Sequence, residues 1–146
     1  MAPDPRSTSR LANDAWESLL TAHAAVLKGI SSTDRWSEVS MREYDVLYTL
    51  SRWDEPIRAR ELNKRVLLSQ PALSRLLDRL AERGLIHRGP DPADGRGMLV
   101  SLTDDGRAMQ RRVGGRHAVD VARLVGSRLS AEEMLVLETL CHKLAR

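Results

Sequence analysis

Polar side chains between positions 69 and 75 have the types and the spacing that reading a base sequence requires. Gln70 can pair bidentately with adenine and Arg75 with guanine, and each such pair is worth roughly 1–3 kcal/mol of discrimination. Ser69 and Ser74 add short hydroxyls that can donate or accept a hydrogen bond. Ser69 also suits the N-cap of a helix, and the two roles are compatible. The stretch is therefore a candidate for contact with the major groove of DNA.

Two further arginines extend this candidate set. Arg79 lies one helical turn beyond Arg75, where it would contact a phosphate or pair with Asp78 or Glu82. Arg96 lies in a stretch rich in turn residues and is expected at the tip of a hairpin, a position suited to insertion into the minor groove. The alternative for Arg96 is a side chain that is only solvated.

Two short helices joined by a tight turn are expected to position these side chains. Residues 57–66 are helical in pattern, and Pro71 fits the first turn of the next helix, where any residue's N–H is unpaired. Ala72 lies outside the apolar stripe of this second helix, and Gly84 ends it. The stripe consists of Leu73, Leu76, Leu77 and Leu80. The pattern is typical of a helix-turn-helix.

After Gly84 the spacing of the apolar residues changes from that of a helix to that of a strand. Residues 85–88 and 98–102 have the composition of two short strands, and residues 89–97 between them are dense in Gly, Pro and Asp. Because proline is poorly tolerated in a central strand, residues 89–97 are expected to form a projecting loop. The predicted fold class is therefore mainly α with a small β-hairpin wing, a winged helix-turn-helix.

Further helices at the two ends of the chain complete the expected fold. Apolar residues recur every three or four positions from 10 to 30, and two capping boxes begin other helices, Ser40 with Glu43 and Ser130 with Glu133. A compact winged lobe cannot cover the helices at both ends, so a homodimer that buries them together is the economical arrangement. The alternative is a monomer in which all helices pack within one chain.

These elements give the expected domain organisation. Residues 1–9 are rich in Pro and Ser and are expected to be a disordered tail. Residues 10–146 are expected to form a single domain, with the winged lobe over 40–103. The dimerisation helices are expected over 10–35 and 104–146.

Composition and charge limit the classes of function. The chain of 146 residues has 23 Lys and Arg against 20 Asp and Glu, a formal net charge of +3. Residues 57–103 hold nine of the basic and five of the acidic residues, so positive charge is concentrated there and favours a polyanionic partner. The alternative is a solvated helical surface whose charge has no partner.

Several classes of protein are not expected. No apolar run approaches the roughly 20 residues that span a bilayer, and the first residues lack the apolar stretch of a secretory signal. One cysteine, Cys141, is expected on a buried dimerisation helix and cannot form an internal disulfide, so a reducing cytoplasm is the expected compartment. No Gly-rich phosphate loop, Cys/His dyad or paired histidines occur, so neither an enzyme nor a cofactor is expected.

Two continuous stretches resemble the MarR family of bacterial transcriptional regulators. They are Leu67–Ile86 and Asp91–Gly106, the second with an Asp94-x-Arg96 wing tip and a Leu-Thr-x-x-Gly exit. The resemblance extends from Leu11 to Leu144 and implies a homodimer that binds double-stranded DNA. It also implies a repressor of a pseudo-palindromic operator that a small ligand releases, and a role for Asp94 in holding Arg96 in place.

Three positions depart from the family pattern. Asn63 stands where a small Ala is usual, so its amide is expected to need a partner near the core. Gly95 and Gly97 flank Arg96 where bulkier residues are common. They should make the wing more mobile and its contact with DNA costlier to order.

Aromatic and histidine side chains in the first half of the chain are candidates for an effector pocket. The family often binds effectors between the dimerisation helices and the winged lobe, and the ligand expected there is small and aromatic or anionic. The residues expected to form its floor are Trp16, His23, Tyr44 and Tyr48. The alternative is that aromatics at helical spacing are simply part of the core.

Two functions of different class therefore stay open. The first is a sequence-specific regulator that binds DNA through the recognition helix and the wing. The second is a winged-helix module that contacts another protein, with its positive charge serving solubility alone. Salt dependence separates the two, because phosphate contacts make affinity fall steeply with ionic strength.

Overall fold

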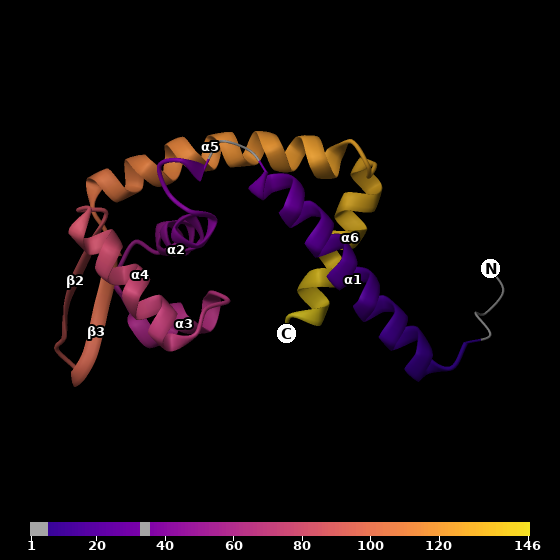
Figure 1. Ribbon diagram of the computed structural model, residues 1–146. Coiled ribbons are helices and arrows are strands. Elements are labelled where there is room, and N and C mark those ends of the chain that lie inside the picture. Colours follow the sequence, from indigo (N-terminus) through magenta and orange to yellow (C-terminus); the bar gives the residue numbers. More distant parts are fainter. Residues whose placement is uncertain (1–5, 33–35) are drawn as a thin grey trace. The chain divides into compact units, whose positions relative to one another are not determined.

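The computed structural model describes residues 6–32 and 36–146 (Figure 1). Over these residues it contains six helices and a three-stranded antiparallel sheet. In chain order the elements are α1 (Thr8–Ser31), α2 (Met41–Ser51), β1 (Ile57–Arg58), α3 (Ala59–Arg65), α4 (Gln70–Glu82), β2 (Ile86–Asp91), β3 (Asp94–Leu102), α5 (Asp104–Gly126) and α6 (Ala131–Leu144). The predicted fold class, mainly α with a small wing, is confirmed.

The chain divides into two compact units. Unit 1 takes its described residues from Met1–Thr33 and Val119–Arg146, and unit 2 takes them from Asp34–Ala118. The first part of α5 belongs to unit 2 and its last part to unit 1. The lobe expected over 40–103 lies within unit 2, which holds α2, α3, α4 and the sheet. Unit 2 is therefore the part of the chain that carries the candidate DNA contacts.

α1 begins within the expected disordered tail, residues 1–9. The Ser7 hydroxyl accepts a hydrogen bond from the Arg10 N–H (3.3 Å) and so caps the helix. The prediction of disorder is therefore wrong for the last two residues of the tail, which are helical. Residues 1–5 of the tail, and 33–35 of the expected dimerisation segment, lie outside the described residues.

Unit 2 has its own apolar core. The leucine stripe of α4 is buried as predicted and packs with apolar side chains of α2, α3, the sheet and α5. Fully buried side chains of this core include Leu47, Leu62, Leu80, Val46, Val100 and Val113. The predicted capping box of α2 is present: the Ser40 hydroxyl accepts from the Glu43 N–H (3.1 Å), and the Glu43 carboxylate accepts from the Ser40 N–H (2.9 Å).

Two residues expected to begin a helix form a strand instead. Ile57 pairs with Val100 and Arg58 with Leu99, so β1 is the third strand of the sheet, in the order β1-β3-β2. α3 begins only at Ala59. A strand of two residues has no period to detect, and only its partner across the sheet defines it. The correction matters because β1 brings Arg58 beside the wing.

The wing has longer strands than predicted, and they continue through most of the expected loop, residues 89–97. β2 extends to Asp91 and β3 begins at Asp94, so the turn between them is tight. Pro90 lies inside β2 and pairs with Met98. The argument against proline applies to central strands, whereas β2 is at the edge of the sheet, where no neighbour needs the missing N–H.

A tight junction joins the end of α4 to the start of α5. Gly84 has φ +70°, in the left-handed region that favours glycine, and it ends α4 as predicted. The Thr103 hydroxyl donates to the Gly84 carbonyl (2.6 Å) and accepts from the Gly106 N–H (2.9 Å). A Cβ at Gly106 would lie 1.9 Å from the Leu85 carbonyl oxygen, so only glycine fits. The junction fixes the base of the wing on the lobe.

Unit 1 consists of α1, the end of α5 and α6, and much of its apolar surface is exposed. A Cβ at Gly29 would lie 3.0 Å from the Leu124 side chain, so glycine allows α1 to approach α5 closely. The exposed large apolar side chains of this unit are Trp16, Leu20, Leu27, Val119, Met134, Leu135, Val136, Leu137, Leu140 and Leu144. Cys141, expected to be buried, is exposed in this single chain. None of the described helices is long and apolar enough to cross a membrane.

Candidate nucleic-acid interface

The N-terminal end of α4 presents the polar residues singled out from the sequence. The Ser69 hydroxyl accepts from the N–H of half-buried Ala72 (3.3 Å), which confirms Ser69 as the N-cap, and Pro71 lies in the first turn. The exposed side chains that follow are Gln70, Ser74 and Arg75. Because the leucine stripe anchors the other side of α4 in the core, these side chains stand on a rigid support.

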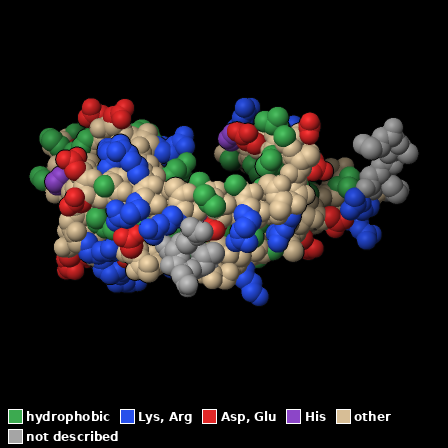
Figure 2. Space-filling model, turned by 90° about the horizontal axis from the view of Figure 1, so that it is seen from above, with side chains coloured by type: hydrophobic (Ala, Val, Ile, Leu, Met, Phe, Trp, Pro, Cys, Tyr) green, Lys and Arg blue, Asp and Glu red, His purple; other side chains and the backbone are tan. Residues whose placement is uncertain are grey.

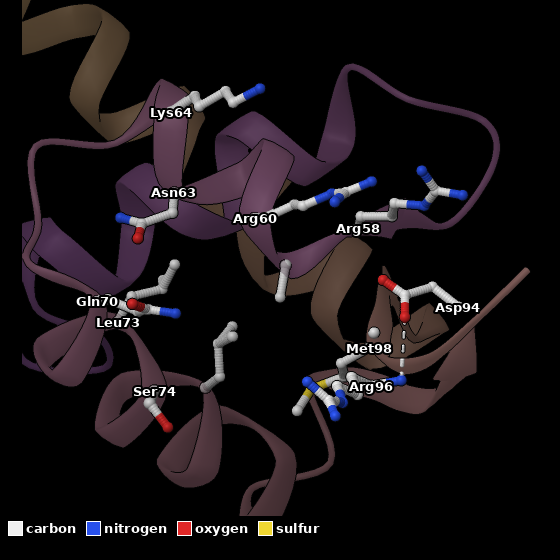
Figure 3. A pocket seen from close by; sticks show the side chains of 13 residues that line it. Arg58, Arg60, Asn63, Lys64, Gln70, Leu73, Ser74, Asp94, Arg96 and Met98 are labelled. Carbon is white, nitrogen blue, oxygen red and sulfur yellow. Dashed lines mark hydrogen bonds between the residues drawn. The ribbon is translucent and has the colours of Figure 1, made fainter.

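An open cavity of about 590 Å³ lies between α3, α4 and the wing (Figure 3). Its lining combines amides and a hydroxyl (Asn63, Gln70, Ser74), four cations (Arg58, Arg60, Lys64, Arg96), the carboxylate of Asp94 and apolar side chains (Leu73, Leu77, Met98). The sequence predicted α4, the recognition helix, and the wing separately. In the structure they form two walls of one hollow. Arg58 pairs with Asp91 and Lys64 with Glu61, so the four cations face three carboxylates with Asp94 included. The hollow therefore stays electropositive and attracts an anion such as a phosphate.

A second group of basic side chains lies on α5, outside the cavity. Figure 2 shows basic and acidic side chains intermingled on the face that is seen from above. Arg112 and Arg116 of α5 lie 2.9 and 3.5 Å from the carboxylate oxygens of Glu38. The hydrogen bond from Arg112 holds the pKa of Glu38 below its ordinary value of 4.5. Arg112 and Arg116 therefore share the single carboxylate of Glu38.

The wing holds Arg96 at the rim of the cavity. Asp94 Oδ1 accepts from the Arg96 backbone N–H (3.1 Å; Figure 3), so Asp94 fixes the turn that carries Arg96. This contact agrees with the holding role that the family resemblance implies, and it acts on the backbone. Gly97, expected to loosen the wing, has a packing reason, because a Cβ there would lie 3.0 Å from the Asp91 Cβ.

A buried carboxylate that the sequence did not single out fixes the base of the turn. Asp91 Oδ1 accepts from the Ala93 N–H (2.9 Å), and Oδ2 accepts from Arg58 Nε (2.6 Å). The hydrogen bond from Ala93, with help from Arg58, holds the pKa of Asp91 below its ordinary value of 3.8 against the opposing effect of burial. Asp91 is therefore a charged group that joins the wing to β1.

Arg79 has a different acidic neighbour from those expected. Its Nε lies 3.7 Å from Glu43 Oε1 on α2, and Arg83 lies 3.5 Å from the other oxygen of that carboxylate. Asp78, one of the expected partners, pairs with Arg88 on β2. Both pairs join residues of different elements, which spacing along one helix does not reveal. Arg79 is 56% exposed, so contact with a phosphate stays a prediction.

Asn63 has the partner that its departure from the family pattern requires. Its Nδ2 donates to the Leu68 carbonyl (2.9 Å) across the turn between α3 and α4. The bond fixes the segment that leads into the recognition helix. Three cations of the cavity, Arg58, Arg60 and Lys64, entered the charge count from the sequence without being identified as site residues. The signal available in the sequence was that these three cations lie within seven positions of one another. That signal indicates the cavity only when β1 is known to pair with β3.

Comparisons with known proteins identify the family. The model of the MarR family matches residues 37–97, which contain α2, α3, α4 and much of the wing. HTH-type transcriptional regulator PecS of Dickeya dadantii is 32% identical over 111 residues, which cover 75% of this chain and 66% of PecS. The chain belongs to the MarR family. Multiple antibiotic resistance protein MarR of Salmonella typhimurium is 40% identical over 84 residues, which cover 58% of this chain and 58% of that protein.

Solved structures of MarR family members share the fold over nearly the whole chain. The PcaV transcriptional regulator from Streptomyces coelicolor, in complex with its natural ligand, aligns with a TM-score of 0.68 at 29% identity, covering 99% of this chain and 96% of PcaV. Sco3205, a MarR family regulator from Streptomyces coelicolor in complex with DNA, aligns with a TM-score of 0.78 at 24% identity, covering 99% of this chain and 91% of Sco3205. The predicted winged helix-turn-helix is confirmed.

The four residues expected at an effector pocket of this MarR family member fall into two groups. Trp16 and His23 are exposed on α1 in unit 1. Tyr44 and Tyr48 are on α2 in unit 2, where their rings stack with centroids 6.1 Å apart. Tyr44 is a buried part of the core, and this burial raises the pKa of its hydroxyl. Tyr48 is 43% exposed, so of the two stacked rings it is the accessible one.

Proposed function

We propose that this MarR family member is a sequence-specific, DNA-binding transcriptional regulator that represses a pseudo-palindromic operator. The observation that carries the proposal is the cavity, because Gln70 and Ser74 of the recognition helix and Arg96 of the wing line one electropositive hollow. The polar side chains suit base edges, and the cations suit phosphates. If the positive charge served solubility alone, it would not need to lie beside polar side chains that suit base edges.

The geometry suggests how DNA would dock. α4 would enter the major groove with Gln70 and Arg75 toward the bases, and the wing would bring Arg96 to the adjacent minor groove. The phosphate strand between the grooves would then pass the cavity, where Arg60 and Lys64 of α3 are placed to bind it. Phosphate contacts would supply affinity, and contacts from α4 would supply sequence preference.

A homodimer is the second part of the proposal. The exposed apolar side chains of α1 and α6 form a surface that unit 1 does not cover itself. A second copy offers the same surface, and two-fold symmetry is the commonest way in which identical chains bury it. Two recognition helices would then meet half-sites roughly 34–36 Å apart, which makes the operator pseudo-palindromic.

Release by a small-molecule effector is the third part. PcaV was solved in complex with its natural ligand, and we extend ligand response to this chain on that basis. Tyr48, the accessible ring of the stacked pair in unit 2, is the proposed contact for a small aromatic or anionic effector. A thermal-shift screen of aromatic carboxylates tests the idea. A compound supports the idea if it raises the unfolding temperature of the wild type more than that of Tyr48→Ala and also weakens the binding of DNA. A screen that finds no such compound counts against effector release.

Selection of genomic DNA with the purified protein tests the proposal as a whole. Fragments retained at moderate salt are sequenced, and the DNA upstream of the protein's own gene is scored separately. We expect an enriched inverted repeat, and we expect Arg75→Ala, a change at an exposed side chain, to weaken the enrichment and relax it at one position. Retention without sequence preference that vanishes at modest salt would contradict the proposal. That result would favour a winged-helix module that contacts another protein.

A further inference from the structure

Arg58 is held at the edge of the cavity by a buried carboxylate. Its Nε lies 2.6 Å from Oδ2 of Asp91, whose side chain is only 4% exposed, while the Arg58 side chain is 38% exposed. Arg58 and Arg60 both line the cavity (Figure 3). A guanidinium has five N–H donors in a planar fork, and the contact through Nε uses only one of them. Arg58 can therefore bind Asp91 and an incoming anion at the same time.

The wing fixes the same carboxylate from two further sides. Asp91 Oδ1 accepts from the Ala93 N–H (2.9 Å) in the turn. A Cβ at Gly97 would lie 3.0 Å from the Asp91 Cβ and 3.3 Å from Oδ2, so the glycine on the facing strand leaves room for the carboxylate. Asp91 is thus locked by the turn, by β3 and by Arg58. One charged group sets the orientation of Arg58 relative to the wing.

We propose that Arg58 is an additional phosphate-binding residue of the DNA interface and that Asp91 is its positioning residue. The inference rests on the proposed function and extends it to two residues outside the recognition helix and the wing tip. An arginine already held in one orientation loses less freedom on binding than a solvated one. Its planar fork also matches the geometry of a phosphate better than an ammonium group does. Asp91 therefore prepares Arg58 for DNA before DNA arrives.

A purely structural role for the pair makes a different prediction. The pair would then only connect the wing to β1, and affinity for DNA would depend on it through folding alone. The slope of log affinity against log salt concentration distinguishes the two roles, because it reports the counterions released by phosphate contacts. A structural pair leaves the slope unchanged, whereas a lost phosphate contact lowers its magnitude.

The experiment measures affinity for the selected operator fragment by fluorescence anisotropy from about 50 to 200 mM salt. Arg58→Gln is expected to lower the magnitude of the slope by about 0.9 for each protomer and to weaken all sequences alike. Asp91→Asn keeps an oxygen for the Ala93 N–H but loses the charge that faces Arg58, so a smaller loss of affinity is expected. The double variant should bind no more weakly than Arg58→Gln alone, because Asp91 acts through Arg58.

Arg6→Gln is the matched control, since Arg6 pairs with Asp14 at the same 2.6 Å in the other unit, and its slope should equal that of the wild type. If Arg58→Gln does not fold, Arg58→Lys replaces it: the charge and the slope are kept, and affinity falls because the fork is lost. An unchanged slope in Arg58→Gln, wild-type affinity in Arg58→Lys, or additive losses in the double variant would each overturn the inference.

Failure of the proposed function would look different. In that case the wild-type protein itself shows no sequence preference at any salt concentration, and the inference about Arg58 falls with the function on which it rests. A wild type that binds its operator with a steep slope, beside an Arg58→Gln variant with the same slope, overturns only the inference.

Discussion

Leu137, Leu140 and Leu144 of α6 follow the three- or four-residue spacing of the α4 leucines but have opposite exposure. The four in α4, Leu73, Leu76, Leu77 and Leu80, are at most 3% exposed. The four in α6, Leu135, Leu137, Leu140 and Leu144, are between 43% and 68% exposed. The α4 stripe packs on a core that unit 2 supplies, whereas unit 1 leaves the α6 stripe uncovered. One region covers its leucines within the chain, and the other leaves them exposed.

An apolar stripe does not by itself distinguish a core helix from an association helix. What decides is whether the same chain supplies enough neighbours to cover the stripe. In unit 2 they are supplied, and the other side of α4 presents Gln70, Ser74 and Arg75 to solvent. In unit 1 they are not. We propose DNA contact for unit 2 and dimerisation for unit 1, and matched changes in the two units test this division.

The largest contrast is expected from truncating one leucine in each region. Leu80→Ala removes a fully buried side chain and should lower the free energy of unfolding by about 2–5 kcal/mol. Leu140→Ala changes a side chain that is 57% exposed and should stay within about 0.5 kcal/mol in dilute protein. Urea unfolding followed by tryptophan fluorescence measures both. At high protein concentration a dimer should form, and Leu140→Ala should then also lower the free energy of unfolding. If it does not, α6 is not part of the proposed interface.

The next contrast concerns arginines and DNA. Arg75→Ala should weaken binding to the selected operator by roughly 1–3 kcal/mol and relax base preference at one position. Arg96→Ala should weaken many sequences alike. Arg128→Ala, between α5 and α6, is the control in unit 1 and should bind as the wild type does. Anisotropy titrations with operator and scrambled duplexes measure all three, and wild-type binding by both lobe variants would show that the docking geometry is wrong.

The two capping boxes offer the same chemistry in both regions. Ser40→Ala and Ser130→Ala each remove an N-cap hydroxyl and should each lower helix stability by about 1 kcal/mol. Only Ser130→Ala should also weaken dimerisation, because it loosens the start of α6. Urea midpoints and sedimentation equilibrium separate the two effects. An equal loss of dimer in Ser40→Ala would contradict the assignment of association to unit 1.

The smallest contrast concerns two amides of similar geometry. Asn63 Nδ2 donates to the Leu68 carbonyl at 2.9 Å in a half-buried turn, and Asn13 Nδ2 donates to the Ser9 carbonyl at 2.8 Å on exposed α1. Asn63→Ala should lower stability by about 0.5–1.5 kcal/mol, since it leaves a carbonyl without its donor. Asn13→Ala should stay within about 0.5 kcal/mol. Thermal unfolding of the two variants checks this, and equal midpoints would mean that the turn does not depend on Asn63.

Elements with a strong local signal could be predicted from the sequence. α4 has a leucine stripe, a proline in its first turn and a glycine after its end, and each of these acts within a few residues. The two capping boxes are local in the same sense. β1 and the outer parts of the wing strands were missed because a strand depends on its partner. Nothing in Ile57 and Arg58 alone indicates that β3 will lie beside them.

The candidate site likewise contains residues that local patterns predict and residues that only the folded chain brings together. Gln70, Ser74 and Arg96 could be found because a helix and a hairpin place them by local rules. Arg58 and Asp91 are 33 positions apart, so no spacing rule joins them. The same holds for Arg79 and its neighbour on α2. Local motifs therefore predicted the side chains that we propose to face the bases, whereas Arg58, Asp91 and the partner of Arg79 became visible only in the folded chain.

The central claim is that unit 2 reads DNA as one half of a dimer, and affinity and stoichiometry measured together test it most directly. The purified protein is titrated into the selected operator and into a scrambled duplex of equal length at physiological salt, and sedimentation gives the mass of each complex. We predict two chains on each inverted repeat and a preference for the operator of about a thousandfold or more. Equal affinity for the two duplexes, or one chain on each repeat, would contradict the account.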